Sequence, residues 1–206
     1  MESMYVTACL QQLEDFLSVD NQIMLKDNIK WFSEVRRSII EYLTDEQIKS
    51  LSSKVKSRLQ YEANLFHKLS NRWGLICMAT GTGKSKVAID AIKTLVEFRP
   101  YAKILIVVPT AKLRDKTWKN EFIEWEAENI WDTVVDKICY ASLSSRQGCY
   151  YDLVIMDEVH NLTERSSDFF LYNEIKTCMA LTATPPEDQL KQMLLDKYNL
   201  PVIYEI

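Results

Sequence analysis

The chain has 206 residues, of which 47% are hydrophobic and 26% are charged, and its formal net charge at pH 7 is -4. This composition is typical of a globular protein with one full core, and it excludes a disordered tail, a collagen-like repeat and a disulfide scaffold. The sequence contains only 4 glycines. Two of them, Gly81 and Gly83, lie close together, which predicts a turn whose backbone conformation other residues would avoid.

No targeting or membrane segment is predicted. The first ten residues include Glu2 and lack a basic start followed by an apolar run. The longest apolar run, Ile104–Val108, is far shorter than a membrane span. The 5 cysteines are scattered and form no C-x-x-C pair. We therefore expect reduced thiols, no membrane partner, and a cytoplasmic or otherwise intracellular location (the host cytoplasm for a viral protein).

From residue 1 to about residue 56, apolar residues recur at helical spacing. The pattern covers Tyr5–Leu17 and Ile29–Leu43, and Thr44 with Gln47 forms a capping-box pattern for a further helix. No chemical motif lies in this segment. It is predicted to be a small helical extension that serves packing or partner binding.

From Trp73 onwards, short apolar runs alternate with helical stretches, an order typical of an α/β doubly wound fold. The runs lack polar alternation, which indicates a mainly parallel sheet buried on both faces. Strands are predicted at Leu75–Met78, Ile104–Val108, Ile138–Tyr140, Leu153–Met156, Met179–Leu181 and Val202–Tyr204, and helices at Lys84–Glu97, Lys112–Glu126 and Gln189–Lys197. The predicted division is a helical extension (1–56) and an α/β domain (57–206).

The segment Ala79-Thr80-Gly81-Thr82-Gly83-Lys84-Ser85 lies between a predicted strand and a predicted helix, as a phosphate-binding loop requires. Its glycines let backbone N–H groups turn towards phosphate oxygens, and the helix N-terminus adds a partial positive charge. We predict that Thr80, Gly81, Thr82, Gly83, Lys84 and Ser85 bind ATP. Lys84 would reach the β- and γ-phosphates, and Ser85 would hold Mg²⁺. Because Met78 replaces the first glycine of the strict pattern, an ordinary turn is the alternative.

Two carboxylates follow the apolar strand predicted at residues 153–156. Asp157 can hold Mg²⁺ through water, and Glu158 can orient the attacking water. An exposed acidic loop is the alternative. Thr182 and Thr184 follow another predicted strand, where their hydroxyl groups can hydrogen-bond the acidic motif and sense the γ-phosphate. A plain turn that ends at proline is the alternative for these two.

The motifs A-T-G-T-G-K-S, V-P-T, D-E-V-H and T-A-T, in this order, resemble those of the superfamily-two helicases and translocases, the DExD/H-box group. The resemblance covers about residues 57–206. It implies a RecA-like P-loop domain that binds ATP and Mg²⁺ and hydrolyses ATP when nucleic acid is bound. Members of that family often replace the first loop glycine, which accounts for Met78.

The resemblance also implies roles for residues near the ATP site. Gln60 resembles the upstream glutamine that hydrogen-bonds adenine, although the family's usual Tyr-Gln order is Leu-Gln-Tyr here. His160 joins Lys84, Asp157 and Glu158 in the catalytic group, and with Thr182 and Thr184 it would couple the ATP state to the grip on nucleic acid.

Nucleic-acid contacts are implied at Pro109, Thr110, Lys112 and Ser142, which resemble the family's backbone-gripping residues. Arg114, Lys116 and Lys119 would add positive charge beside them. Trp118 resembles a helix tryptophan of the family, for which core packing is expected. His67 lies outside every motif and is predicted to be structural.

The family's motor consists of two RecA-like domains, and the second supplies an arginine finger. No motif of the second domain follows Pro186, so we expect the first motor domain alone, with slow hydrolysis until a second domain completes it in cis or in trans. An ATP-switched protein-interaction module without nucleic-acid activity is the alternative. A P-loop kinase fits poorly, because D-E-V-H and T-A-T would be unexplained. The loop sequence M-A-T-G-T-G-K-S and the V-P-T segment resemble duplex-DNA translocases more than RNA-specific DEAD-box proteins, and the fourth residue of D-E-V-H is His rather than Asp. DNA is therefore favoured over RNA.

Overall fold

The computed structural model describes residues 53–185 and 188–206, so the helices predicted in the first 52 residues lie outside the described residues. Six strands form one parallel sheet in the order β3-β2-β5-β7-β1-β8. The strands are β1 (Trp73–Cys77), β2 (Ile104–Val108), β3 (Val135–Cys139), β5 (Leu153–Met156), β7 (Cys178–Thr182) and β8 (Val202–Glu205). A separate two-stranded sheet pairs β4 (Tyr150–Tyr151) with β6 (Glu174–Ile175). The predicted mainly parallel sheet is confirmed.

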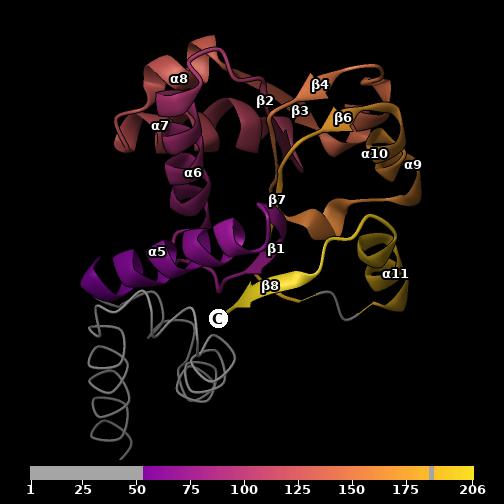
Figure 1. Cartoon of the computed structure of the whole chain (residues 1–206), viewed down its shortest axis with the longest axis horizontal. Helices are drawn as coiled ribbons and strands as arrows, with labels where there is room; N and C mark the ends of the chain where they lie inside the picture. The colour runs from indigo at the N-terminus through magenta and orange to yellow at the C-terminus, as the bar shows by residue number, and fades with distance from the viewer. Residues whose placement is uncertain (1–52, 186–187) are drawn as a thin grey trace, which may run out of the picture.

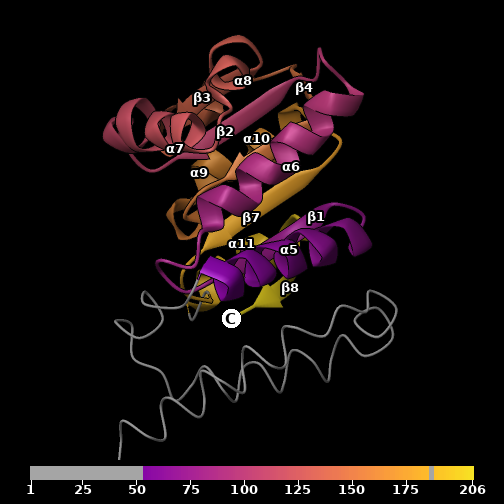
Figure 2. The same ribbon diagram turned by 90° about the vertical axis from the view of Figure 1, so that its left-hand side faces the viewer.

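Helices cover both faces of the six-stranded sheet (Figures 1 and 2). One face carries α5 (Ser53–Leu69), α6 (Lys84–Phe98), α7 (Lys119–Glu124) and α8 (Glu128–Thr133). The other carries α9 (Glu164–Ser167), α10 (Phe169–Tyr172) and α11 (Gln189–Lys197).

Alternate residues of the strands other than β8 belong to opposite cores. Ile76 packs with α5 and α6, whereas its neighbours Leu75 and Cys77 pack with the helices of the other face. Both faces of the sheet are therefore buried. This explains why the sequences of the inner strands β1, β2, β5 and β7 are almost entirely apolar.

The helix predicted over residues 112–126 is interrupted by a π-helical turn at Leu113–Trp118, which leads directly into α7. A π turn holds one residue more than an α turn and therefore rotates the side chains that follow it. The apolar spacing of this segment gives no signal for that extra residue. The predicted helix is present from Ala111 to Glu124, and the π-helical stretch inside it is the feature that was not predicted.

The strand predicted at Ile138–Tyr140 begins earlier, at Val135, and ends at Cys139. β3 is an edge strand of the sheet, so its polar residues Asp136 and Lys137 are only partly buried. Because these two residues are polar, the run of apolar residues does not mark the start of the strand. Tyr140 instead begins a 3₁₀ turn, η2 (Tyr140–Ser145).

Three other expectations can be compared with the structure. Within residues 53–185 and 188–206, no helix is both long and apolar enough to cross a membrane. The four cysteines of these ranges are free thiols. His67 is buried, and its Nε2 lies 3.1 Å from the carbonyl oxygen of Cys178 on β7, consistent with a structural residue.

The carboxyl ends of the parallel strands gather the predicted motifs at one edge of the sheet. The glycine-containing loop follows β1, Pro109 follows β2, Asp157 follows β5, and Thr182 is the last residue of β7. In α/β folds, ligands bind at this edge. The candidate site is therefore built where the motifs meet.

Candidate functional site

The loop between β1 and α6 turns through two glycines in the left-handed region, with φ of +88° at Gly81 and +93° at Gly83. The Thr82 hydroxyl group donates to the carbonyl oxygen of Ala79 at 2.6 Å and closes the turn. Thr82 is buried, whereas Thr80 and Gly81 are exposed at the tip. The glycine pair noted in the sequence therefore serves the backbone conformation of this loop.

Gln60 reaches the loop from α5. Its Nε2 donates to the carbonyl oxygen of Thr82 at 3.0 Å. A Cβ atom on Gly83 would overlap this amide group. The structure thus brings Gln60 against the loop, while its predicted contact with adenine remains a prediction.

Gly83→Ala is expected to destabilise the loop and weaken nucleotide binding, because the added Cβ is strained at a φ of +93° and displaces the Gln60 amide. The strain costs about 1–3 kcal/mol, which thermal unfolding and calorimetric titration with ADP can measure. Gly148→Ala is the matched control, because Gly148 also has a positive φ, of +67°, but has open space around it. If both variants bind ADP like the parent chain, the close packing of Gln60 on the loop has no role in binding.

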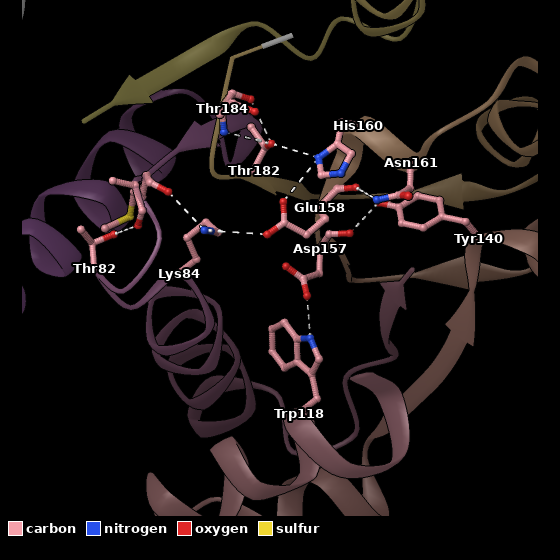
Figure 3. A network of polar contacts seen from close by, with 12 residues as sticks. Thr82, Lys84, Trp118, Tyr140, Asp157, Glu158, His160, Asn161, Thr182 and Thr184 are labelled. Atoms are coloured by element: carbon pink, nitrogen blue, oxygen red, sulfur yellow. Dashed lines mark hydrogen bonds and ion pairs between the residues drawn. The ribbon is translucent and has the colours of Figure 1, made fainter. Parts of the chain in front are cut away.

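Lys84, the first residue of α6, lies between the loop and the acidic motif. Its Nζ donates to the carbonyl oxygen of Met78 at 3.2 Å and lies 3.9 Å from Oε1 of Glu158 (Figure 3). The ammonium group has three donors, and its contact with Glu158 is long for an ion pair. Lys84 therefore retains donors that an anionic ligand can accept.

Asp157 is held from two sides. Its Oδ2 accepts a hydrogen bond from Nε1 of Trp118 at 2.9 Å, and its backbone carbonyl oxygen accepts one from the Tyr140 hydroxyl group at 3.0 Å. Burial raises the pKa of Asp157, whereas the hydrogen bond from Trp118 acts in the opposite direction. Trp118 is buried, as its predicted packing role requires. Its hydrogen bond to the acidic motif was not predicted.

Glu158 carries a buried carboxylate oxygen without a hydrogen-bond partner in the described part of the chain. This atom, Oε2, lies 3.4 Å from Nδ1 of His160. The backbone of Glu158 is left-handed, with a φ of +49°. Both features cost free energy in the isolated chain. A buried oxygen of this kind fits a site in which a bound water or ligand supplies the missing donor.

The D-E-V-H and T-A-T motifs contact each other (Figure 3). Nδ1 of His160 lies 3.4 Å from Oγ1 of Thr182. The Thr182 hydroxyl group also donates to the carbonyl oxygen of Thr184 at 3.0 Å. The contact expected between strand-end hydroxyls and the acidic motif is therefore present, while the coupling role remains a prediction.

Ser85 has a partner that the sequence analysis did not anticipate. Its hydroxyl group donates to Oε2 of Glu121 on α7 at 2.9 Å, and Nε1 of Trp125 donates to the same oxygen at 3.3 Å. Mg²⁺ prefers oxygen ligands, and the Ser85 hydroxyl and the Asp157 carboxylate both supply them. The two predicted ligands thus fit the ion in chemistry. A W-x-x-E pattern, which puts Trp118 and Glu121 one helical turn apart, was the available signal for Glu121.

The predicted nucleic-acid residues lie after β2 and β3, two neighbouring strands. Thr110, Lys112 and Ser142 are exposed, and Pro109 is partly buried. The Thr110 hydroxyl group accepts a hydrogen bond from the backbone N–H of Leu113 at 3.3 Å, just before the helical segment that begins at Ala111. These residues are brought to one edge but are separate from the cluster around Lys84.

The basic stripe expected around Lys112 is weaker than predicted. Arg114 donates two hydrogen bonds to the carboxylate of its neighbour Asp115, at 2.6 and 2.9 Å. This pair offsets the charge of the arginine. Lys112 and Lys116 are exposed and Lys119 is partly buried, and these three lysines supply the remaining positive charge of the segment.

The profile of a family described as "Type III restriction enzyme, res subunit" matches residues 34–187, which is more than half of the chain. A curated protein of Sulfurisphaera tokodaii, described as DNA 3'-5' translocase XPB2, is 29% identical over 186 residues. That alignment covers 83% of this chain and 40% of the relative. The chain thus spans about two fifths of the length of the curated relative.

Two solved structures resemble the fold. The Sulfolobus solfataricus SWI2/SNF2 ATPase core in complex with dsDNA matches with a TM-score of 0.55 and 17% identity, over 70% of this chain and 34% of the other. The Pyrococcus furiosus Hef helicase domain matches with a TM-score of 0.54 and 16% identity, over 70% of this chain and 36% of the other. At these identities the likeness extends to the fold alone.

Proposed function

Because the chain belongs to the family of the type III restriction enzyme res subunit and has the first RecA-like domain of a superfamily-two helicase or translocase, we propose that it is the ATP-binding half of a nucleic-acid-dependent ATPase. We assign residues 57–206 to the motor domain and residues 1–56 to a helical extension. ATP and Mg²⁺ are the proposed cofactors, and an intracellular compartment is the proposed location.

The observation that carries the proposal is the convergence of a left-handed glycine loop, a lysine and two carboxylates at one edge of a parallel sheet. Lys84 Nζ lies 3.9 Å from Glu158 Oε1, and Glu158 Oε2 is buried without a hydrogen-bond partner among the described residues. An arrangement that holds a cation close to a carboxylate with one unsatisfied buried oxygen suits a bound phosphate chain with its attacking water.

The roles follow from the chemistry of the side chains. Thr80, Gly81, Thr82 and Gly83 surround the phosphates with backbone N–H groups, Lys84 donates to the β- and γ-phosphates, and Gln60 contacts adenine. Ser85 and Asp157 hold Mg²⁺, which when bound neutralises charge on the phosphate oxygens. Glu158 orients the attacking water and accepts its proton. His160, Thr182 and Thr184 link this centre to the bound nucleic acid.

Duplex DNA is the proposed partner, with Pro109, Thr110, Lys112 and Ser142 as contacts to its backbone. Support comes from the exposure of Thr110, Lys112 and Ser142 at one edge of the sheet. Further support comes from relatives described as a DNA translocase and as an ATPase core bound to dsDNA. A second RecA-like domain, in cis or in trans, is the other proposed partner.

The test is ATP turnover by the chain combined with a second RecA-like domain, measured with duplex DNA, single-stranded DNA, RNA and no polynucleotide. We expect stimulation by polynucleotide, greatest with duplex DNA. Stimulation by RNA alone would overturn the assignment to DNA. Binding of ATP without a response to any polynucleotide would instead favour an ATP-switched protein-interaction module.

A further inference from the structure

The helical segment that follows the predicted nucleic-acid contacts touches both predicted ligands of Mg²⁺. Glu121 Oε2 accepts a hydrogen bond from the Ser85 hydroxyl group, and Trp118 Nε1 donates one to Asp157 Oδ2, each at 2.9 Å. We propose that Glu121 and Trp118 are positioning residues for the metal ligands of the nucleotide site. This inference rests on the proposed function, in which Ser85 and Asp157 hold the ion.

The hydrogen bond to Glu121 sets the direction of the Ser85 hydroxyl group. A hydroxyl group has one donor and two acceptor lone pairs, and only the lone pairs can bind a metal. Because the proton points to Glu121, the lone pairs of Ser85 Oγ are free to face the ion. Partners outside the ligand shell orient metal ligands in this way in many proteins.

The carboxylate of Glu121 is itself fixed. Nε1 of Trp125 donates to the same Oε2 atom at 3.3 Å. The ammonium group of Lys86 lies 4.7 Å from the centre of the Trp125 ring, a cation–π contact that holds this ring in turn. Glu121 therefore presents its oxygen to Ser85 from a defined position.

Trp118 fixes the second ligand. Its side chain is 2% exposed, and its ring lies 6.3 Å from that of Phe122, so packing defines its orientation. The indole N–H can only donate, and it occupies Oδ2 of Asp157. The other carboxylate oxygen, Oδ1, accepts no hydrogen bond from Trp118 and can face the ion or a water bound to it.

The experiment measures the affinity of the full chain for ADP by calorimetry, with Mg²⁺ and without divalent metal. Glu121→Ala is expected to reduce the affinity gained from Mg²⁺ by about 10–100-fold, as outer-shell substitutions do, and to leave metal-free ADP binding unchanged. Glu121→Gln keeps an acceptor oxygen and is expected to restore most of the gain. Glu124→Ala, at an exposed position of α7, is the matched control and should resemble the parent chain.

Trp118→Phe preserves an aromatic ring and removes the N–H group. It should lower the ADP affinity gained from Mg²⁺ in the same way as Glu121→Ala. The Glu121 variants test the proposal even if this buried substitution prevents folding. The proposal would be overturned if Mg²⁺ raised the ADP affinity of Glu121→Ala as much as it raises that of the parent chain. It would also be overturned if Glu121→Ala lost metal-free ADP binding to the same extent as binding with Mg²⁺, because that result indicates a structural role. A parent chain whose ADP affinity is unaffected by Mg²⁺ would overturn the proposed function itself.

Discussion

Lys84→Ala is expected to abolish nucleotide binding at ordinary concentrations. The ammonium group is proposed to donate to the β- and γ-phosphates, and a hydrogen bond to a charged group contributes about 1.5–3 kcal/mol. Loss of two such bonds weakens affinity by about 10²–10⁴-fold. Calorimetric titration of the variant with Mg²⁺ and a non-hydrolysable ATP analogue, which carries both the β- and the γ-phosphate, measures this loss directly.

The fold of the Lys84→Ala variant should be retained. Within the described residues, the side chain makes one hydrogen bond, at 3.2 Å, and one ion pair, at 3.9 Å. Lys93→Ala is a suitable control, since Lys93 is an exposed lysine of the same helix. If the Lys84→Ala variant binds the nucleotide like the control, the loop between β1 and α6 is not the phosphate site.

The parts of the site that the sequence predicted are those that depend on local pattern. Gly81 and Gly83 adopt the left-handed conformations that their spacing suggested, and β2 and β5 have the predicted bounds. Because parallel strands end at a common edge, the order of the motifs was enough to bring the loop and the acidic motif together.

The missed parts depend on contacts between segments far apart in the sequence. The hydrogen bonds from Ser85 to Glu121 and from Trp118 to Asp157 each join two elements. Residue spacing alone does not encode the angle at which two helices pack. The π turn at Leu113–Trp118 rotates the side chains that follow it, and the apolar pattern gives no signal for it.

The partners of the charged side chains also could not be predicted from the sequence. Arg114 was predicted to add positive charge beside the nucleic-acid contacts, yet it pairs with its immediate neighbour Asp115. Conversely, the buried Oε2 of Glu158 has no hydrogen-bond partner within the described residues, although Nδ1 of His160 lies 3.4 Å away. The number of charged residues in a segment does not show which of them are paired and which are not.

The isolated chain is expected to hydrolyse ATP about 10³–10⁵-fold more slowly than the complex with a second RecA-like domain, the range associated with an arginine finger. The ion pairs of Glu158 in the described part of the chain involve only Lys84 and His160, so neither is with an arginine. A guanidinium group from another domain would add the charge that stabilises the transferring phosphoryl group.

Phosphate release at saturating ATP and duplex DNA measures this difference when the chain is assayed alone and then joined to a domain that carries the arginine.

Glu158→Gln is the informative companion variant. Its amide cannot accept the proton of the attacking water, so stimulation should be lost while calorimetric binding of Mg²⁺ and ATP persists. Robust turnover by the isolated parent chain would contradict the need for a second domain. Loss of binding in Glu158→Gln would instead show that this carboxylate holds the nucleotide rather than the water.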